Sequence, residues 1–164
     1  MDDPARRQAE VPYPTGLYVP GHPSLLAACA RLHGLDPAAP AECRYLDLGC
    51  GDGTNTIAVA ESLPGSRCLG IDIAPAAIER GGELRDAVGI DNVELEAADF
   101  RDAAPEPGAW DFVVLHGILS WVPDDARVAA LDLAARSLAP NGVLMASYNA
   151  LPGWWLLQPA RALA

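Results

Sequence analysis

Residues 46–56 read LDLGCGDGTNT, an apolar stretch that runs into glycines at every second position, Gly49, Gly51 and Gly53. The apolar start fits a buried strand, and the glycines let the backbone turn sharply and approach a ligand closely, because no Cβ stands in the way. The residues that follow are typical of a helix, whose first turn offers unpaired N–H groups and a partial positive charge. The stretch therefore predicts a strand, a ligand-binding turn and a helix.

Asp47 places a carboxylate at the end of this strand, and Cys50 lies inside the turn. The carboxylate would repel a phosphate, whereas it would hold an ammonium group. The alternative is that the glycines only make a tight turn. We favour ligand binding and expect a zwitterionic nucleoside rather than a pyrophosphate.

The composition fits one domain with a sizeable core, since 51% of the 164 residues are hydrophobic. The chain has no run of eighteen apolar residues, and residues 1–14 are polar and proline-rich, so neither a membrane span nor a secretory signal is expected. The four cysteines form no CxxC pair and show no metal-ligand spacing with the three histidines. We expect a cytoplasmic protein with reduced thiols and no metal site.

The charge is strongly acidic, with 22 Asp and Glu against 11 basic residues and a net charge of −11. All the basic residues are arginine. Nucleic acid is excluded as a partner on this ground, because its phosphates need a basic surface. A basic protein would be attracted, although acidity by itself mostly provides solubility.

The remaining sequence alternates between strand-like and helix-like segments. Strands are predicted at 44–49, 67–73, 92–99, 110–117 and 143–149, and helices at 22–33, 54–62, 75–87 and 123–137, with an Asn141-Gly142 turn before the last strand. Short strands separated by helices indicate a parallel sheet with helices on both faces. The predicted fold class is α/β, a Rossmann-like domain with about five strands.

Three further strand ends carry residues suited to a nucleoside, and ligands of such sheets bind at the carboxyl ends of the strands. Asp72 ends the second strand, where a carboxylate can accept the ribose hydroxyls. Asp99 and Phe100 follow the third, offering an acceptor for an amine and a ring that stacks on a base, and His116 ends the fourth. The alternatives are that the two acids cap helices or lie solvated in loops, and that the phenylalanine belongs to the core.

Nicotinamide dinucleotide is the rival ligand, since it also uses a glycine turn and an acid on the second strand. Its fingerprint is G-x-G-x-x-G. Here Thr54 stands at the sixth position and Gly53 lies one place early. Asp47 and Asp99 have no role in that interpretation, which we therefore rank below the nucleoside with an ammonium group.

Asp47-x-Gly49-x-Gly51-x-Gly53, Asp72 and Asp99-Phe100 together resemble the class I S-adenosylmethionine-dependent methyltransferases. The resemblance implies S-adenosylmethionine as the cofactor, with its methionine end at the glycine turn. By the same resemblance Asp72 would hold the ribose, Ile73 would pack on the adenine, and Asp99 would bind the adenine amine.

Three more stretches narrow the resemblance: YPTGLYVPGHP at 13–23, HGILSWVP at 116–123 and SYNALPGW at 147–154. They look like the branch with an appended C-terminal regulatory domain, which includes bacterial protein-lysine methyltransferases. The implied methyl acceptor is a protein side chain, with lysine as a hypothesis, or a small molecule. Because the chain contains no lysine, methylation of its own lysines is excluded.

The family sheet has seven strands, and two of them would follow the strand at 143–149. The chain stops at Ala164, so we expect a truncated methyltransferase domain at 22–164, preceded by an N-terminal arm at 1–21. The fifth strand would then offer an exposed edge for self-association. The alternative to an enzyme is a non-catalytic module that binds S-adenosylmethionine or a partner.

His116 is the candidate for accepting a proton from the methyl acceptor, and a structural histidine is the alternative. Tyr148 and Asn149, at the end of the fifth strand, would shape the acceptor pocket or orient an amine. Ser120 and Trp121 would line the same wall, with core packing as the alternative for the tryptophan.

Tyr13, Tyr18 and His22 precede the first predicted helix. We expect this arm to fold over the cofactor as a lid that excludes water. The alternative is an arm that lies on the surface.

Overall fold

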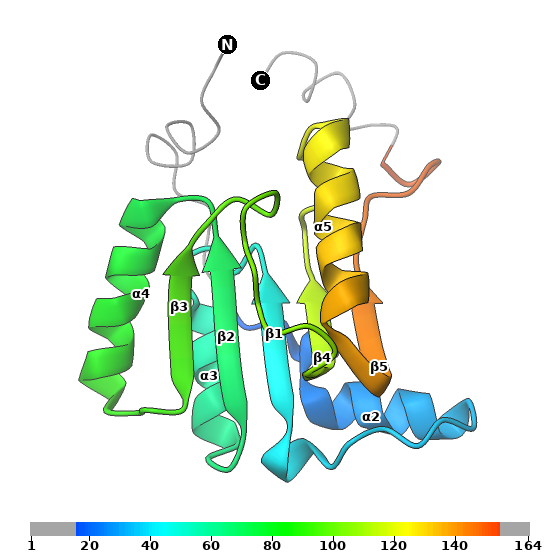
Figure 1. Cartoon of the computed structure of the whole chain (residues 1–164), viewed down its shortest axis with the longest axis horizontal. Coiled ribbons are helices and arrows are strands. Elements are labelled where there is room, and N and C mark those ends of the chain that lie inside the picture. Colours follow the sequence, from blue (N-terminus) through cyan, green and yellow to red (C-terminus); the bar gives the residue numbers. More distant parts are fainter. Residues whose placement is uncertain (1–15, 155–164) are drawn as a thin grey trace.

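Five parallel strands form one sheet in the order β3-β2-β1-β4-β5 in the computed structural model, which describes residues 16–154 (Figure 1). The strands are β1 (Arg44–Leu48), β2 (Arg67–Asp72), β3 (Val93–Ala97), β4 (Trp110–Leu115) and β5 (Leu138–Ala146). The chain proceeds outward from β1 to β3, then crosses to β4 on the other side of β1. Such a switch point opens a crevice at the carboxyl ends of the two strands that flank it.

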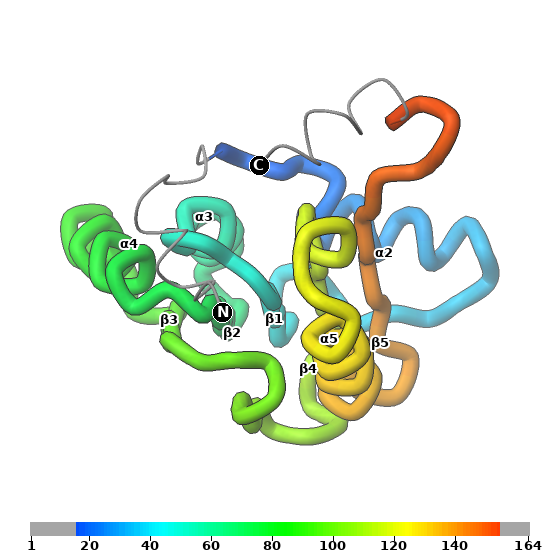
Figure 2. Tube along the Cα trace, turned by 90° about the horizontal axis from the view of Figure 1, so that it is seen from above, coloured from blue at the N-terminus to red at the C-terminus, as the bar shows by residue number. Residues whose placement is uncertain are grey.

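Helices cover both faces of the sheet, as predicted. The helices are α2 (Pro23–Leu32), α3 (Thr54–Ser62), α4 (Pro75–Val88) and α5 (Asp124–Ser137), with short 3-10 turns at Val19–Gly21 and Pro40–Glu42. Figures 1 and 2 place α5 on the face opposite to α2 and α3, while α4 lies along the β3 side. The predicted α/β, Rossmann-like fold is confirmed.

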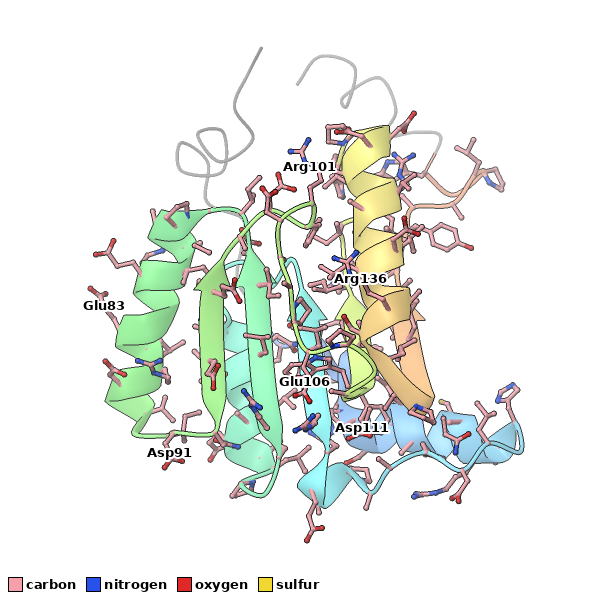
Figure 3. All side chains as sticks on the ribbon, in the orientation of Figure 1. Glu83, Asp91, Arg101, Glu106, Asp111 and Arg136 are labelled. Carbon is pink, nitrogen blue, oxygen red and sulfur yellow. The ribbon has the colours of Figure 1, made fainter. Side chains whose placement is uncertain are left out.

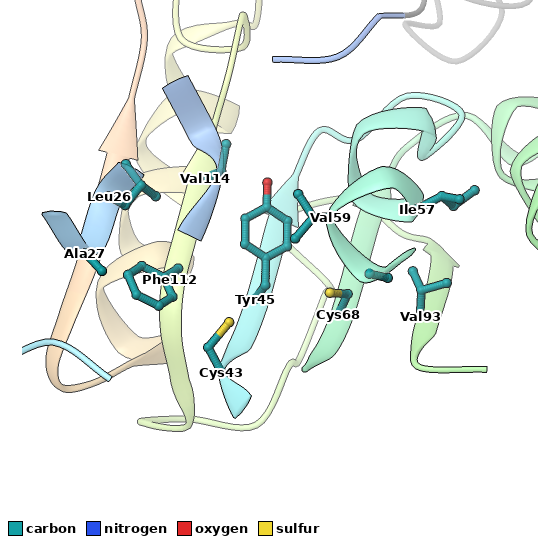
Figure 4. Close-up of a cluster of buried hydrophobic side chains, with 11 residues drawn as sticks. Leu26, Ala27, Cys43, Tyr45, Ile57, Val59, Cys68, Val93, Phe112 and Val114 are labelled. Atoms are coloured by element: carbon teal, nitrogen blue, oxygen red, sulfur yellow. The ribbon is translucent and has the colours of Figure 1, made fainter. Parts of the chain in front are cut away.

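Alternate residues of the central strands supply two cores, one on each face. Tyr45 and Phe112 pack with Leu26 of α2 and Ile57 of α3 (Figure 4). Their neighbours along the strands, such as Leu46, pack with α5 on the opposite face. Because both faces are covered, the central strands are almost continuously apolar.

The last strand differs from its prediction, because β5 begins at Leu138 rather than at 143 and ends at Ala146 rather than at 149. Leu138 pairs with Trp110, and regular pairing resumes at Val143 opposite Phe112, with a register shift between them. Asn141 lies within this irregular stretch and has a φ of 64°, a conformation that asparagine tolerates better than most residues. The predicted Asn-Gly turn is therefore a bulge inside the strand.

In residues 16–154 no helix is long and apolar enough to cross a membrane. The same residues hold no group of three or more His, Cys, Asp or Glu side chains arranged for a metal ion. Tyr13 of the predicted lid lies outside the described residues.

Candidate functional site

The glycine turn connects β1 to α3 at the crevice and needs glycine at all three positions. Gly49, Gly51 and Gly53 have φ values of 83°, 62° and 71°, which L residues rarely adopt. The N–H groups of Gly49 and Cys50 both donate to the carbonyl of Ile71, at 2.7 and 3.2 Å. The turn is thereby fixed to the end of β2.

Asp72 strengthens this attachment with its carboxylate, which is only 4% exposed. Oδ2 accepts a hydrogen bond from Gly51 N–H at 2.9 Å, and Oδ1 accepts one from Ala74 N–H at 2.9 Å. The N-cap of α4 is Ala74, without a side-chain bond, so Asp72 is not its N-cap. It instead joins the glycine turn to the loop after β2.

Asp47 lies beneath the turn and is held by α3. Its carboxylate accepts hydrogen bonds from Thr56 Oγ1 at 2.9 Å and Asn55 Nδ2 at 3.4 Å. Burial raises the pKa of Asp47 to about 6, although these two bonds favour its charged form. A cation placed beside it would lower that pKa again, which suits the predicted ammonium group.

Cys50 shares the interior of the turn as an uncharged thiol. A Cβ added to Gly70 would lie 2.8 Å from its sulfur, so the thiol packs closely against β2. Burial raises the pKa of Cys50 well above its ordinary value. Cys50 therefore behaves as a small apolar side chain inside the turn, and a contact with the cofactor stays a prediction.

The loop after β3, which holds Asp99 and Phe100, lies next to the end of β2, because Ala98 N–H donates to the carbonyl of Asp72 at 2.9 Å. Asp99 is engaged by Arg101, a residue that the sequence pattern did not single out. Phe100 is half-buried, packs on the α5-side core and would contact a Cβ on Gly49 at 3.7 Å. Its core role is thus established, and its ring also borders the turn.

His116 lies after β4 and is surrounded by two partners from distant parts of the chain. Its Nδ1 is 2.9 Å from Ser147 Oγ, which also accepts a hydrogen bond from Gly117 N–H at 2.9 Å. The ring of Tyr18 stacks on the imidazole. Partial burial lowers the pKa of His116 below its ordinary value, so the neutral ring predominates at pH 7.

The other two predicted catalytic residues, Tyr148 and Asn149, directly follow Ser147 in the chain. The side chain of Tyr148 is 69% exposed. Asn149 is tied to the loop after β4 through its backbone, since its N–H donates to Ser120 Oγ at 2.8 Å. The loops after β4 and β5 are therefore joined twice, once by Ser147 and once by Ser120. Roles for Tyr148 and Asn149 stay predictions.

The described part of the N-terminal arm contributes Tyr18 to the site. Its backbone N–H donates to Asn55 Oδ1 at 2.9 Å, so the arm is bound to α3 beside the glycine turn. His22 instead contacts two helices. Its Nδ1 accepts a hydrogen bond from Ser24 N–H at the start of α2, and its Nε2 is 3.0 Å from Ser62 Oγ of α3. Its position is that of a helix cap.

Comparison with known proteins decides the family. The profile of a family described as a methyltransferase domain matches residues 40–158. The chain belongs to this methyltransferase domain family. The resemblance to class I methyltransferases drawn from the sequence is thereby confirmed.

Individual relatives agree with this assignment. PKMT2 from Rickettsia typhi, solved in complex with AdoHcy, is similar with a TM-score of 0.86 and 36% identity, covering 93% of this chain and 29% of PKMT2. The protein RP028 of Rickettsia prowazekii is 37% identical over 145 residues, which are 88% of this chain and 58% of RP028. The trans-aconitate 2-methyltransferase of Methylobacterium nodulans is 37% identical over 107 residues, 65% of this chain and 38% of that enzyme. This methyltransferase domain thus spans less than two thirds of each relative.

Proposed function

We propose that this domain binds S-adenosylmethionine at the crevice between β1 and β4 and transfers its methyl group to a protein side chain, lysine being the first candidate, or to a small molecule. The observation that carries the proposal is the glycine turn, which Asp72 holds at the carboxyl end of the sheet. PKMT2, which was solved in complex with AdoHcy, supports the cofactor part of the proposal by similarity.

The residues present fit this cofactor. A Cβ added to Gly51 would meet nothing within 4 Å, so a ligand has room to approach the backbone there. Asp47 would neutralise the ammonium group, and Asp72 would hold the ribose. Ile73, which is half-buried, and Phe100 would flank the adenine, whose amine Asp99 would accept.

When bound, the cofactor supplies an activated methyl group. The protein then has to align the acceptor, exclude water and remove one proton from the acceptor. His116 is suited to the proton, because its imidazole is neutral and Nδ1 is fixed by Ser147. Among the described residues Nε2 has no hydrogen-bond partner, and it would take the acceptor proton. Tyr148 and Asn149 would orient the acceptor.

Calorimetry with S-adenosylhomocysteine tests the binding half of the proposal. We expect saturable binding by the full chain and its loss in Asp72→Ala. Asp91→Asn is a matched control, because Asp91 is exposed in the loop before β3, at the opposite end of the sheet (Figure 3). An Asp72→Ala variant that folds and binds with unchanged affinity would refute the site.

Transfer of a labelled methyl group to lysine-containing peptides tests the catalytic half. The absence of lysine from this chain removes lysine self-methylation as a background. Labelled peptide that disappears in His116→Gln at unchanged cofactor affinity would support the role of the imidazole. Cofactor binding without transfer to peptides or small-molecule extracts would instead favour a non-catalytic binding module.

A further inference from the structure

Arg101 uses all three groups of its guanidinium on two carboxylates. Nε donates to Asp99 Oδ1 at 2.9 Å and one terminal nitrogen donates to Asp99 Oδ2, while the other terminal nitrogen donates to Asp125 Oδ2 at 2.9 Å. Figure 3 shows Arg101 at the carboxyl-end side of the sheet, close to the start of α5. The arginine thus ties Asp99, in the loop after β3, to the first turn of α5.

Arg101 nearly fills the acceptor positions of Asp99. An ionised carboxylate offers about four such positions on its two oxygens. The backbone N–H of Arg101 takes a further one on Oδ1, at 2.9 Å, so Oδ1 accepts two bonds from this residue and Oδ2 accepts one. Among the described residues no other donor reaches this side chain, which leaves a single position on Oδ2.

We propose that Arg101 determines the specificity of the site for the base of the cofactor. By fixing the Asp99 carboxylate, it leaves one acceptor position in a set orientation, which favours a 6-aminopurine over a 6-oxopurine. This inference rests on the proposed cofactor site. An adenine amine donates to such an acceptor, whereas the 6-oxygen of hypoxanthine faces it with another acceptor and is rejected.

Orientation rather than charge is the contribution of the arginine. The hydrogen bonds from Arg101 lower the pKa of Asp99 below its ordinary value, but a carboxylate with an ordinary pKa is already ionised at pH 7 without them. A planar, two-point contact holds both oxygens in one plane, which a single charge does not do. A free carboxylate would turn and present two or more acceptors to either base.

The test compares binding of S-adenosylhomocysteine with binding of S-inosylhomocysteine, its 6-oxo analogue, by calorimetry at pH 7. We expect the wild-type preference for the amino form to shrink about two- to fivefold in Arg101→Met, the range measured for exposed ion pairs. Arg101→Lys keeps the charge but loses the planar two-point contact, so its preference for the amino form should shrink as much as in Arg101→Met. Asp125→Asn removes only the second anchor and should shift the preference less, in the same direction.

Arg85→Met is the control, because Arg85 makes a comparable ion pair within α4, with Asp86. An unchanged preference in folded Arg101→Met, a full preference in Arg101→Lys, or tighter binding of both ligands without the arginine would each overturn the inference. Failure of the wild-type chain to bind either ligand would overturn the proposed function instead.

Discussion

The ring of Tyr18 stacks on the imidazole of His116, with centroids 3.4 Å apart and planes inclined by 13°. The stack joins a residue of the N-terminal arm to the end of β4, and it keeps water from one face of the imidazole. Burial is the cause of the lowered pKa of His116. The arm therefore helps to keep this histidine neutral.

Removing the stacked ring should raise the pKa of His116. In Tyr18→Ala we expect the value to move toward 6.5, because the imidazole regains water on that face. A titration of the imidazole proton signals by NMR measures it. Tyr148→Ala serves as control, since the Tyr148 ring is largely exposed, and it should leave the titration unchanged. An unshifted titration in Tyr18→Ala would mean that other groups shield the imidazole.

Asn55 should be needed to hold the arm in place. Its side chain accepts from Tyr18 N–H and donates to the buried Tyr45 hydroxyl at 3.2 Å. Asn55→Ala leaves that hydroxyl unpaired, so the free energy of unfolding should fall by about 1–3 kcal/mol. Urea denaturation measures the loss, and hydrogen exchange at the Tyr18 amide should quicken. Glu61→Ala, at an exposed position of the same helix, should change neither.

Asp47 should make stability depend on pH. Its pKa is about 6 in the folded protein against 3.8 ordinarily, so the folded state holds more protons between these values. The free energy of unfolding must then fall as the pH rises from about 4 to 6. Asp47→Asn should remove this fall, which amounts to about 3 kcal/mol, and should be the more stable protein above pH 6. Thermal unfolding of both proteins across this range checks the difference; equal slopes would contradict the buried, raised carboxyl.

Gly51 and Gly82 should respond oppositely to a methyl group. Neither would have a neighbour within 4 Å of the added Cβ, but only Gly51 has a positive φ. Gly51→Ala should cost about 1–2 kcal/mol of stability, and its methyl group should weaken cofactor binding about tenfold or more. Gly82→Ala, inside α4, should stabilise by about 0.5–1 kcal/mol and leave binding unchanged. Denaturation curves and calorimetry separate the two effects.

Most of the sheet was predictable from the sequence, because β1, β2 and β4 are short apolar segments, each followed by a helix. The carboxyl-end residues Asp72 and Asp99 were predictable for the same reason, since a parallel sheet gathers its strand ends at one edge. The start of β5 was not. The Asn141-Gly142 pair predicts a turn before the strand. Asn141 does have a positive φ, but strand pairing begins before it, at Leu138, through a bulge that hydrophobic periodicity does not reveal.

The hydrogen-bond partners of the candidate site residues could not be predicted from the sequence pattern either. Ser147 lies 31 positions from His116, and Asn55 lies 37 positions from Tyr18. Arg101 is close to Asp99 in sequence, yet its bond to Asp125 spans 24 positions. Side chains that meet over such separations leave no periodic signal, because their meeting depends on how the loops fold over the sheet.

The bond between Gly51 N–H and Asp72 bears on how fast a ligand can be captured. It fixes the glycine turn before any ligand arrives, so docking requires no slow rearrangement of this segment. We expect stopped-flow traces with one exponential phase, whose rate rises linearly with ligand concentration. Asp72→Asn keeps only one acceptor oxygen for the two N–H groups of Gly51 and Ala74, so the turn should loosen. An ordering step should then follow the encounter, and the rate should level off at high concentration.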